Sequence, residues 1–192
     1  MPLQLNVIVA STRPGRVGIH VGRWFHGVAA GHPAFEARLV DLAEVGLPLY
    51  DEPRHPRLRQ YEHEHTRRWS AIVEAADAFV LVTPEYNYSP TPALTNALDF
   101  VFQEWANKPA AFVSYGGVSG GLRAVQATKV TLSALGVVPI NTAVVIPQVA
   151  EQVKEGAFAP KEIQSKAAKA LLDELARYAE ALKPLRVTAR SI

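Results

Sequence analysis

Apolar residues follow two different patterns along this chain. Short and largely apolar runs lie at 5–10, 35–42, 78–83, 110–115 and 138–146. Runs of this length are typical of strands, and runs that are apolar on both faces are typical of parallel sheets. Between the runs, apolar residues recur every three or four positions, which predicts helices.

The order of these elements predicts the fold class. Helical spacing begins near Arg16, recurs around Trp69, from Thr91 to Trp105 and over 122–135, and returns after Pro160. Five strands that alternate with five helices predict an α/β protein with a doubly wound parallel sheet and helices on both faces. The common five-stranded order for this pattern is 2-1-3-4-5, in which ligands bind at the carboxyl ends of the strands.

The first loop at that edge suits an anion. Residues 11–18 read STRPGRVG and lead from a strand directly into a helix. The N–H groups and the dipole at a helix N-terminus attract phosphate or carboxylate, and Arg13 and Arg16 add formal charge. Ser11 and Thr12 add hydroxyl donors, while Gly18 allows the backbone to approach a ligand closely.

The two other loops at that edge suit a flat ring. Residues 84–92 hold Glu85, Tyr86 and Asn87 between prolines that stiffen the segment, and residues 114–121 contain four glycines. A stiff loop can present fixed backbone groups to a planar heterocycle, and glycines leave backbone exposed on the opposite wall. The three loops together predict a phosphate-bearing cofactor with a planar ring, and FMN is such a molecule.

Composition narrows the class of protein. A chain of 192 residues that is 48% hydrophobic fits a single domain spanning 1–192. The net charge of +2 and the absence of a dense basic patch argue against nucleic acid, and zero cysteines exclude disulfides, thiolate metal sites and a cysteine nucleophile. No signal peptide or membrane span is visible, so we expect a soluble cytoplasmic protein with no resident metal.

The loops STRPGRVG and TPEYN, the segment PALTNALDF and the glycine pair before Leu122 together resemble the NADPH-dependent FMN reductase family. The resemblance covers most of residues 3–146 and implies a flavodoxin-like fold with FMN as cofactor and NADPH or NADH as co-substrate. By position, it implies that the phosphate is surrounded by Ser11, Thr12, Arg13, Arg16, Val17 and Gly18. It implies that the ring and ribityl chain lie between Pro84, Glu85, Tyr86 and Asn87 on one side and Ser114, Tyr115, Gly116 and Gly117 on the other.

The resemblance also implies a reaction. The family includes flavin, quinone, chromate and azo-dye reductases, which suggests a ping-pong exchange between the reduced nicotinamide and a small electron acceptor. The chemistry belongs to the cofactor, so we nominate no catalytic acid or base. The loop 114–117 is expected to supply backbone donors to the reduced ring. Family members are usually homodimers or homotetramers, and Phe100 and Phe102, which lie outside the main stripe of the helix from Leu94 to Trp105, predict a second buried face.

Two positions depart from the family pattern. Many relatives have a serine where this chain has Gly18, which predicts a backbone contact to phosphate in place of a hydroxyl. Relatives often have a glycine where this chain has Tyr88, which predicts a narrower substrate side. The arginine-bearing segment 48–65 is expected to be a mobile, solvated loop.

Two other functions fit parts of the sequence. Residues 117–121, GVSGG, match the G-x-S-x-G elbow of serine hydrolases, with Ser119 as nucleophile, although every histidine precedes it in the chain and such hydrolases place the histidine after the serine. The alternative within flavoproteins is a non-enzymatic electron carrier of the flavodoxin type. The arginines of the first loop and the slightly positive net charge argue against this alternative.

Overall fold

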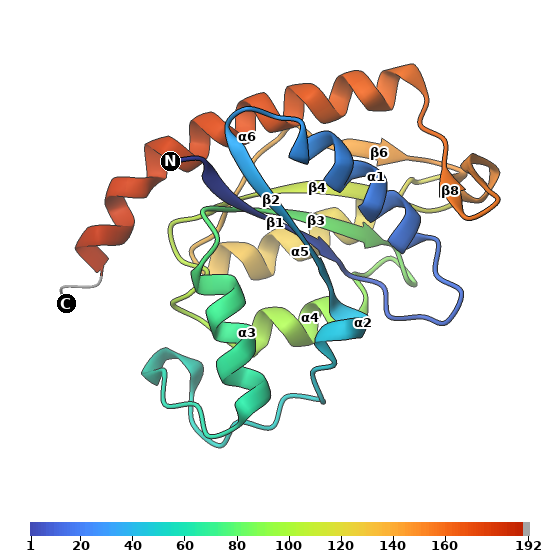
Figure 1. Ribbon diagram of the computed structural model, residues 1–192. Coiled ribbons are helices and arrows are strands. Elements are labelled where there is room, and N and C mark those ends of the chain that lie inside the picture. The colour runs from blue at the N-terminus through green and yellow to red at the C-terminus, as the bar shows by residue number, and fades with distance from the viewer. Residues whose placement is uncertain (190–192) are drawn as a thin grey trace.

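The computed structural model describes residues 1–189, and a parallel sheet forms its centre (Figure 1). The strand order is β2-β1-β3-β4-β5, and β6 also pairs with β4. The prediction of a doubly wound parallel sheet with the order 2-1-3-4-5 is therefore confirmed. The strands are β1 (Leu3–Val9), β2 (Phe35–Asp41), β3 (Ala78–Pro84), β4 (Pro109–Tyr115), β5 (Val138–Pro139) and β6 (Val144–Ile146).

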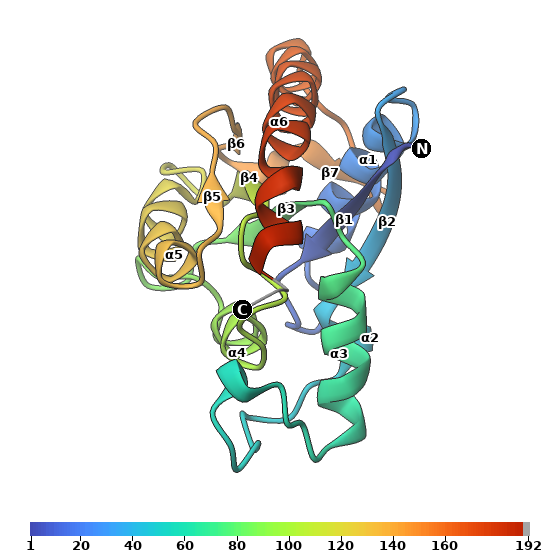
Figure 2. The same ribbon diagram turned by 90° about the vertical axis from the view of Figure 1, so that its left-hand side faces the viewer.

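Helices cover both faces of the sheet, as the alternation predicted (Figures 1 and 2). One face packs against α1 (Gly18–Ala30) and α6 (Glu162–Ala189), and its core contains Phe25, Leu171 and Leu175. The other face packs against α3 (Glu64–Glu74), α4 (Pro92–Asp99) and α5 (Leu122–Ala134), with Trp69 and Trp105 at ring centroids 5.9 Å apart. Short elements complete the fold, namely α2 (Leu42–Val45), the 3-10 helices η1 (Pro56–Leu58) and η2 (Val149–Gln152), and the hairpin strands β7 (Val153–Lys154) and β8 (Ala157–Phe158).

The predicted strand over 138–146 was wrong as a continuous element. The structure has two short strands there, and both pair with β4. Pro139 has no N–H for a ladder, and the hydroxyl of Thr142 donates to Glu174 of α6 between the two strands. The chain therefore leaves the ladder before it returns to it at Val144.

The helix predicted from Thr91 to Trp105 starts as expected but ends early. The Thr91 hydroxyl accepts the N–H of Leu94 at 3.1 Å, which caps the helix, and α4 ends at Asp99. Beyond it, the carboxylate of Glu104 accepts the N–H of Phe102 at 3.2 Å, so that donor is lost to the helical ladder. Phe100 is fully buried against Tyr50 and therefore belongs to the protein's own interior, not to an exposed second face.

The first and the last helix differ from the sequence pattern at their N-terminal ends. Helix α1 begins at Gly18 and not at Arg16, because Gly15 has a φ of 70° and the N–H of Arg16 closes a turn onto Arg13 at 3.1 Å. In α6 the buried stripe contains Leu171 but leaves Ile163 exposed at 74%.

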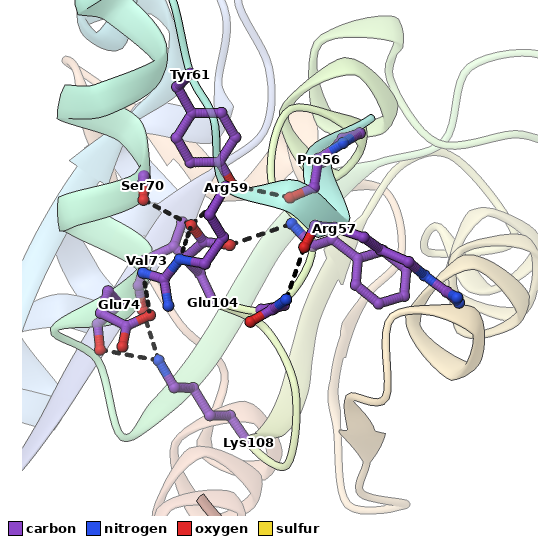
Figure 3. Close-up of polar contacts among 11 residues, drawn as sticks. Pro56, Arg57, Arg59, Tyr61, Ser70, Val73, Glu74, Glu104 and Lys108 are labelled. Carbon is purple, nitrogen blue, oxygen red and sulfur yellow. Dashed lines mark hydrogen bonds and ion pairs between the residues drawn. The ribbon is translucent and has the colours of Figure 1, made fainter. Parts of the chain in front are cut away.

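Segment 48–63 is anchored to the body of the protein, which corrects the expectation of a mobile loop. Glu104 is fully buried, and it accepts hydrogen bonds from Tyr61 at 2.8 Å and Ser70 at 2.7 Å (Figure 3). Arg59 forms ion pairs with Glu104 and with Glu74, both at 3.3 Å. Burial, reinforced by the Glu104 carboxylate, raises the pKa of Tyr61, which keeps its hydroxyl protonated as a donor.

The arginines of this segment have partners of their own. The guanidinium of Arg57 lies 4.4 Å from the centroid of the Phe102 ring, and Arg54 pairs with Glu62 at 3.3 Å. Among residues 1–189, no helix combines the length and apolar character needed to span a membrane.

Candidate functional site

The three loops singled out in the sequence are joined to one another at the carboxyl edge of the sheet. The hydroxyls of Ser11 and Tyr86 are 2.8 Å apart, which connects the loop after β1 to the loop after β3. Ser119 donates to the carboxylate of Glu85 at 3.0 Å, which connects the loop after β3 to the loop after β4. The structure therefore brings the predicted loops together.

The loop after β1 presents donors at the start of α1. Val17 precedes the helix without a capping side chain, so the N–H groups of the first turn have no side-chain acceptor. Arg13 is exposed, whereas Arg16 turns inward and forms an ion pair with the buried Asp41 at the end of β2. Arg16 is thus positioned by the Asp41 carboxylate, which no motif in the sequence had indicated.

The loop after β3 owes its shape to hydrogen bonds as well as to prolines. Tyr86 and Ser89 exchange both backbone hydrogen bonds at 2.9 Å, and the two residues between them, Asn87 and Tyr88, have φ values of 50° and 68°. Positive φ at both central positions is the geometry of a type I′ turn. The Thr91 hydroxyl also donates to the carbonyl of Ala10 at 2.8 Å, which ties this loop to the end of β1.

Glu85 is held by the opposite loop. Its carboxylate accepts the Ser119 hydroxyl and the N–H of Arg123 at 3.1 Å, and it forms an ion pair with the Arg123 guanidinium. Burial acts to raise the pKa of Glu85, but the hydrogen bonds from Arg123 and Ser119 outweigh it and hold that pKa below its usual value. The Glu85 side chain was expected beside a cofactor ring, and the structure commits its carboxylate to this contact between loops.

Arg123 was missed as a site residue. The side chain of Arg123 pairs with the carboxylate of Glu85, 38 residues away in the chain. The sequence signal for Arg123 was its position two residues after Gly121, at the start of a predicted helix.

The Ser119 contacts argue against the hydrolase alternative. Its hydroxyl donates to Glu85 and lies 3.4 Å from the N–H of Gly121. A nucleophilic serine needs a general base that can take its proton, whereas this carboxylate is already neutralised by Arg123. The hydroxyl therefore serves the contact between the two loops.

Strand alternation sends the side chains of Ser114 and Tyr115 in opposite directions. Ser114 points to the α5 side, where a Cβ added to Gly121 would lie 3.0 Å from its Cβ. Tyr115 belongs to the core on the α1 side, and its hydroxyl lies against Gly18. The resemblance had grouped both residues on the ring side, and their side chains serve two different places.

The glycines after β4 differ in what they offer. The N–H of Gly116 already donates to the carbonyl of Ile146 at 3.2 Å. Gly117 is exposed, and a Cβ built on it would meet nothing within 4 Å. Gly117 therefore presents an open backbone surface beside the loop of Glu85.

Comparison with known proteins bears on what this edge of the sheet does. The family model described as NADPH-dependent FMN reductase matches residues 3–151. An NAD(P)H-dependent FMN reductase of Schizosaccharomyces pombe is 34% identical over 160 residues, which are 82% of this chain and 79% of that protein. An NAD(P)H-dependent FMN reductase of Nectria sp is 37% identical over 127 residues, and the match spans 63% of the length of each protein.

A solved structure agrees with these sequence matches. The flavoenzyme FerB of Paracoccus denitrificans, an NAD(P)H:(acceptor) oxidoreductase, superposes with a TM-score of 0.75 and 26% identity. The superposition covers 93% of this chain and 98% of that one. The fold, the three joined loops and the family model agree, and this chain belongs to the NADPH-dependent FMN reductase family.

Proposed function

We propose that FMN binds along the carboxyl edge of the sheet, with its phosphate at the start of α1 and its ring between the loops after β3 and β4. Ser11, Thr12, Arg13, Arg16, Val17 and Gly18 would hold the phosphate end. Pro84, Glu85, Tyr86, Asn87, Ser114, Tyr115, Gly116 and Gly117 would hold the remainder. For Glu85, the proposal concerns its backbone, since its carboxylate is paired with Arg123.

The observation that carries this proposal is a set of buried polar atoms without partners. The buried polar atoms without a hydrogen bond in the described residues include Arg16 Nε, Ser114 Oγ and Tyr115 Oη, which belong to the joined loops or to the strand end beside them. Buried polar groups are normally satisfied, so this grouping supports a polar ligand that completes them. Arg16 Nε and Tyr115 Oη, together with the N-terminus of α1, suit the phosphate of FMN. The open backbone at Gly117 suits the flavin ring.

The reaction we propose is the NAD(P)H-dependent reduction of a small acceptor, namely a quinone, free flavin, azo compound or metal oxyanion. Bound FMN supplies the centre that accepts a hydride and passes electrons on. NAD(P)H and the acceptor would use the same side of the site in turn, which is a ping-pong order. The loop after β4 was expected to supply backbone donors, but the N–H of Gly116 already donates to the carbonyl of Ile146. We therefore assign to the N–H of Gly117 the role of donating to the reduced ring.

The proposal extends to the organisation of the protein. The family model ends at residue 151, yet α6 packs its Leu171 and Leu175 into the same core as α1, which supports one FMN-binding domain over 1–192. A homodimer or homotetramer belongs to the same proposal, and Leu58 and Val130, exposed at 57% and 74%, are candidates for its interface. A cytoplasmic location belongs to the same proposal, because NAD(P)H is an intracellular reductant.

An absorption spectrum tests the function directly. The purified protein is stripped of flavin, mixed with FMN and then treated with NADPH or NADH without air. Visible flavin bands that bleach with either nicotinamide and return on addition of a quinone support the reductase. Binding without bleaching would instead indicate the electron carrier, and failure to bind FMN would overturn both.

The ping-pong order has its own test. Initial rates measured against NADPH at several quinone concentrations should give parallel double-reciprocal lines. Intersecting lines would show that both substrates bind before either product leaves.

A further inference from the structure

The hydroxyl of Tyr115 occupies the space in which a side chain on Gly18, the first residue of α1, would lie. A Cβ added to Gly18 would lie 2.1 Å from Tyr115 Oη and 3.0 Å from Tyr115 Cζ. No real Cβ atom approaches a heavy atom so closely, so the tyrosine fills the space that any side chain at position 18 would need. The glycine therefore allows the hydroxyl to reach the N-terminal end of the helix.

Within residues 1–189 this hydroxyl has no hydrogen-bond acceptor. Tyr115 is 3% exposed and its Oη is unpartnered. Burial, together with the nearby Tyr86, raises the pKa of Tyr115 above its usual 10.0, so the group stays protonated at neutral pH. The nearby Ser11 hydroxyl acts to lower the pKa of Tyr115, which is the effect of a donor and not of an acceptor. A protonated hydroxyl without an acceptor can donate a hydrogen bond to a bound ligand.

The carboxylate near it, that of Asp41, is paired with Arg16, and the other groups around it are donors. Arg16 Nε is buried without a partner, although the same guanidinium pairs with Asp41 through another nitrogen. The first-turn N–H groups of α1 point to the same end of the helix. A hydroxyl and a guanidinium nitrogen without acceptors, next to a helix N-terminus without a capping side chain, favour an anion over a neutral group.

We propose that Tyr115 donates its hydroxyl to the phosphate of FMN at the start of α1, and that this bond helps the protein to prefer FMN over riboflavin. The inference rests on the proposed function and changes one part of it. The Tyr115 side chain serves the phosphate and not the ring, and Gly18 is required because it leaves room for the hydroxyl.

A purely structural role for Tyr115 makes a different prediction. Its ring packs in the core with Val21 and Val113. If packing were its whole role, phenylalanine would serve equally well, and flavin affinity would not depend on the hydroxyl. Tyr115→Phe keeps the ring and removes only the oxygen, so it separates the two roles.

The experiment measures dissociation constants of FMN and riboflavin by quenching of flavin fluorescence, in buffer without phosphate. We expect Tyr115→Phe to weaken FMN binding about 10- to 100-fold, because a hydrogen bond to a charged group is lost. Riboflavin affinity should stay within about twofold, since no phosphate is present to accept that bond. The flavin-free variant should melt at or above the wild-type temperature, because within the described residues the hydroxyl that it lacks donates to no acceptor.

A matched control is Tyr61→Phe, which removes another buried tyrosine hydroxyl, far from these loops and bonded to Glu104. It should lower the melting temperature and leave the ratio of FMN to riboflavin affinity unchanged. Gly18→Ala should weaken FMN binding. The double variant, with both Gly18→Ala and Tyr115→Phe, should lose less binding free energy than the sum of the two single variants, because the added Cβ no longer meets the tyrosine oxygen.

Each result decides between the possibilities. Equal FMN affinity for wild type and Tyr115→Phe would overturn the inference and leave the proposed function standing. A flavin-free Tyr115→Phe that fails to fold would show that the hydroxyl has a partner within the protein, which also overturns it. A wild-type protein that binds neither flavin would overturn the proposed function itself.

Discussion

The guanidinium carbon of Arg123 lies 3.8 Å from the centroid of the Tyr88 ring, while the same guanidinium pairs with Glu85. One arginine of α5 therefore holds both the base and the tip of the turn that follows β3. Tyr88 is 66% exposed at a φ of 68°, so the contact fixes an aromatic ring at the rim of the proposed flavin site.

Tyr88→Gly should widen the range of acceptors. Removing the ring opens the rim, so kcat/KM for bulky quinones should rise relative to that for a small quinone. Stability should change little, because the lost contact with Arg123 is offset by relief of the positive φ. Steady-state kinetics with a graded series of quinones measures the effect, and Tyr88→Phe serves as the control that retains the ring. An unchanged size preference in Tyr88→Gly would show that this ring does not limit the acceptor.

Glu85 makes stability depend on pH at the acidic end. Its pKa in the folded protein lies below the ordinary value of 4.5, so the folded state binds this proton less readily than the unfolded chain. The contribution of Glu85 is therefore fully present above pH 4.5 and is lost as the pH falls through the lower folded-state value. Melting temperatures of wild type and Glu85→Gln should converge as the pH falls through that range. A constant difference between the two curves would contradict this assignment.

The buried carboxylate of Glu104 should dominate the anchoring of segment 48–63. Glu104→Gln keeps the volume of the side chain but replaces one carboxylate oxygen with an N–H₂ group, which faces the donors of Tyr61, Ser70 and Arg59. We therefore expect a loss of roughly 3 kcal/mol in the free energy of unfolding. Urea denaturation measures it. Glu62→Gln is the matched control, since its partner Arg54 is half-exposed and surface pairs contribute about 0.5 kcal/mol or less. Equal effects of the two changes would refute a special role for Glu104.

Two glycines of α1 should respond in opposite ways to the same change. A Cβ on Gly22 would lie 2.4 Å from a methyl group of Val9, whereas a Cβ on Gly27 would meet nothing within 4 Å. Gly22→Ala should therefore destabilise by about 1–3 kcal/mol through overpacking. Gly27→Ala should stabilise by about 0.5–1 kcal/mol, because it lowers the entropy of the unfolded chain and favours the helix. Thermal melts of the two variants suffice, and destabilisation by Gly27→Ala would contradict the packing described for α1.

The hydrophobic pattern predicted the first four strands and the start of α4, because these depend on interactions between neighbours in the chain. The start of α4 at Thr91 is an example, since a capping hydroxyl acts within three residues. The alternation of strands and helices then predicted the strand order. The end of α4 and the break between β5 and β6 escaped prediction. They depend on Glu104 and on Thr142 bonding to Glu174, and a hydrophobic pattern does not reveal which partner a polar side chain will choose.

The same division applies to the candidate site. The composition of three loops, with strand order, was enough to predict that they meet at one edge, since the ends of parallel strands converge there. Which side chains face a ligand was decided by long-range pairing. Arg123 binds Glu85 over 38 residues, and Tyr115 reaches Gly18 across the sheet. Such contacts arise only when distant segments pack together, because the space and the partners that select them do not exist in the unfolded chain.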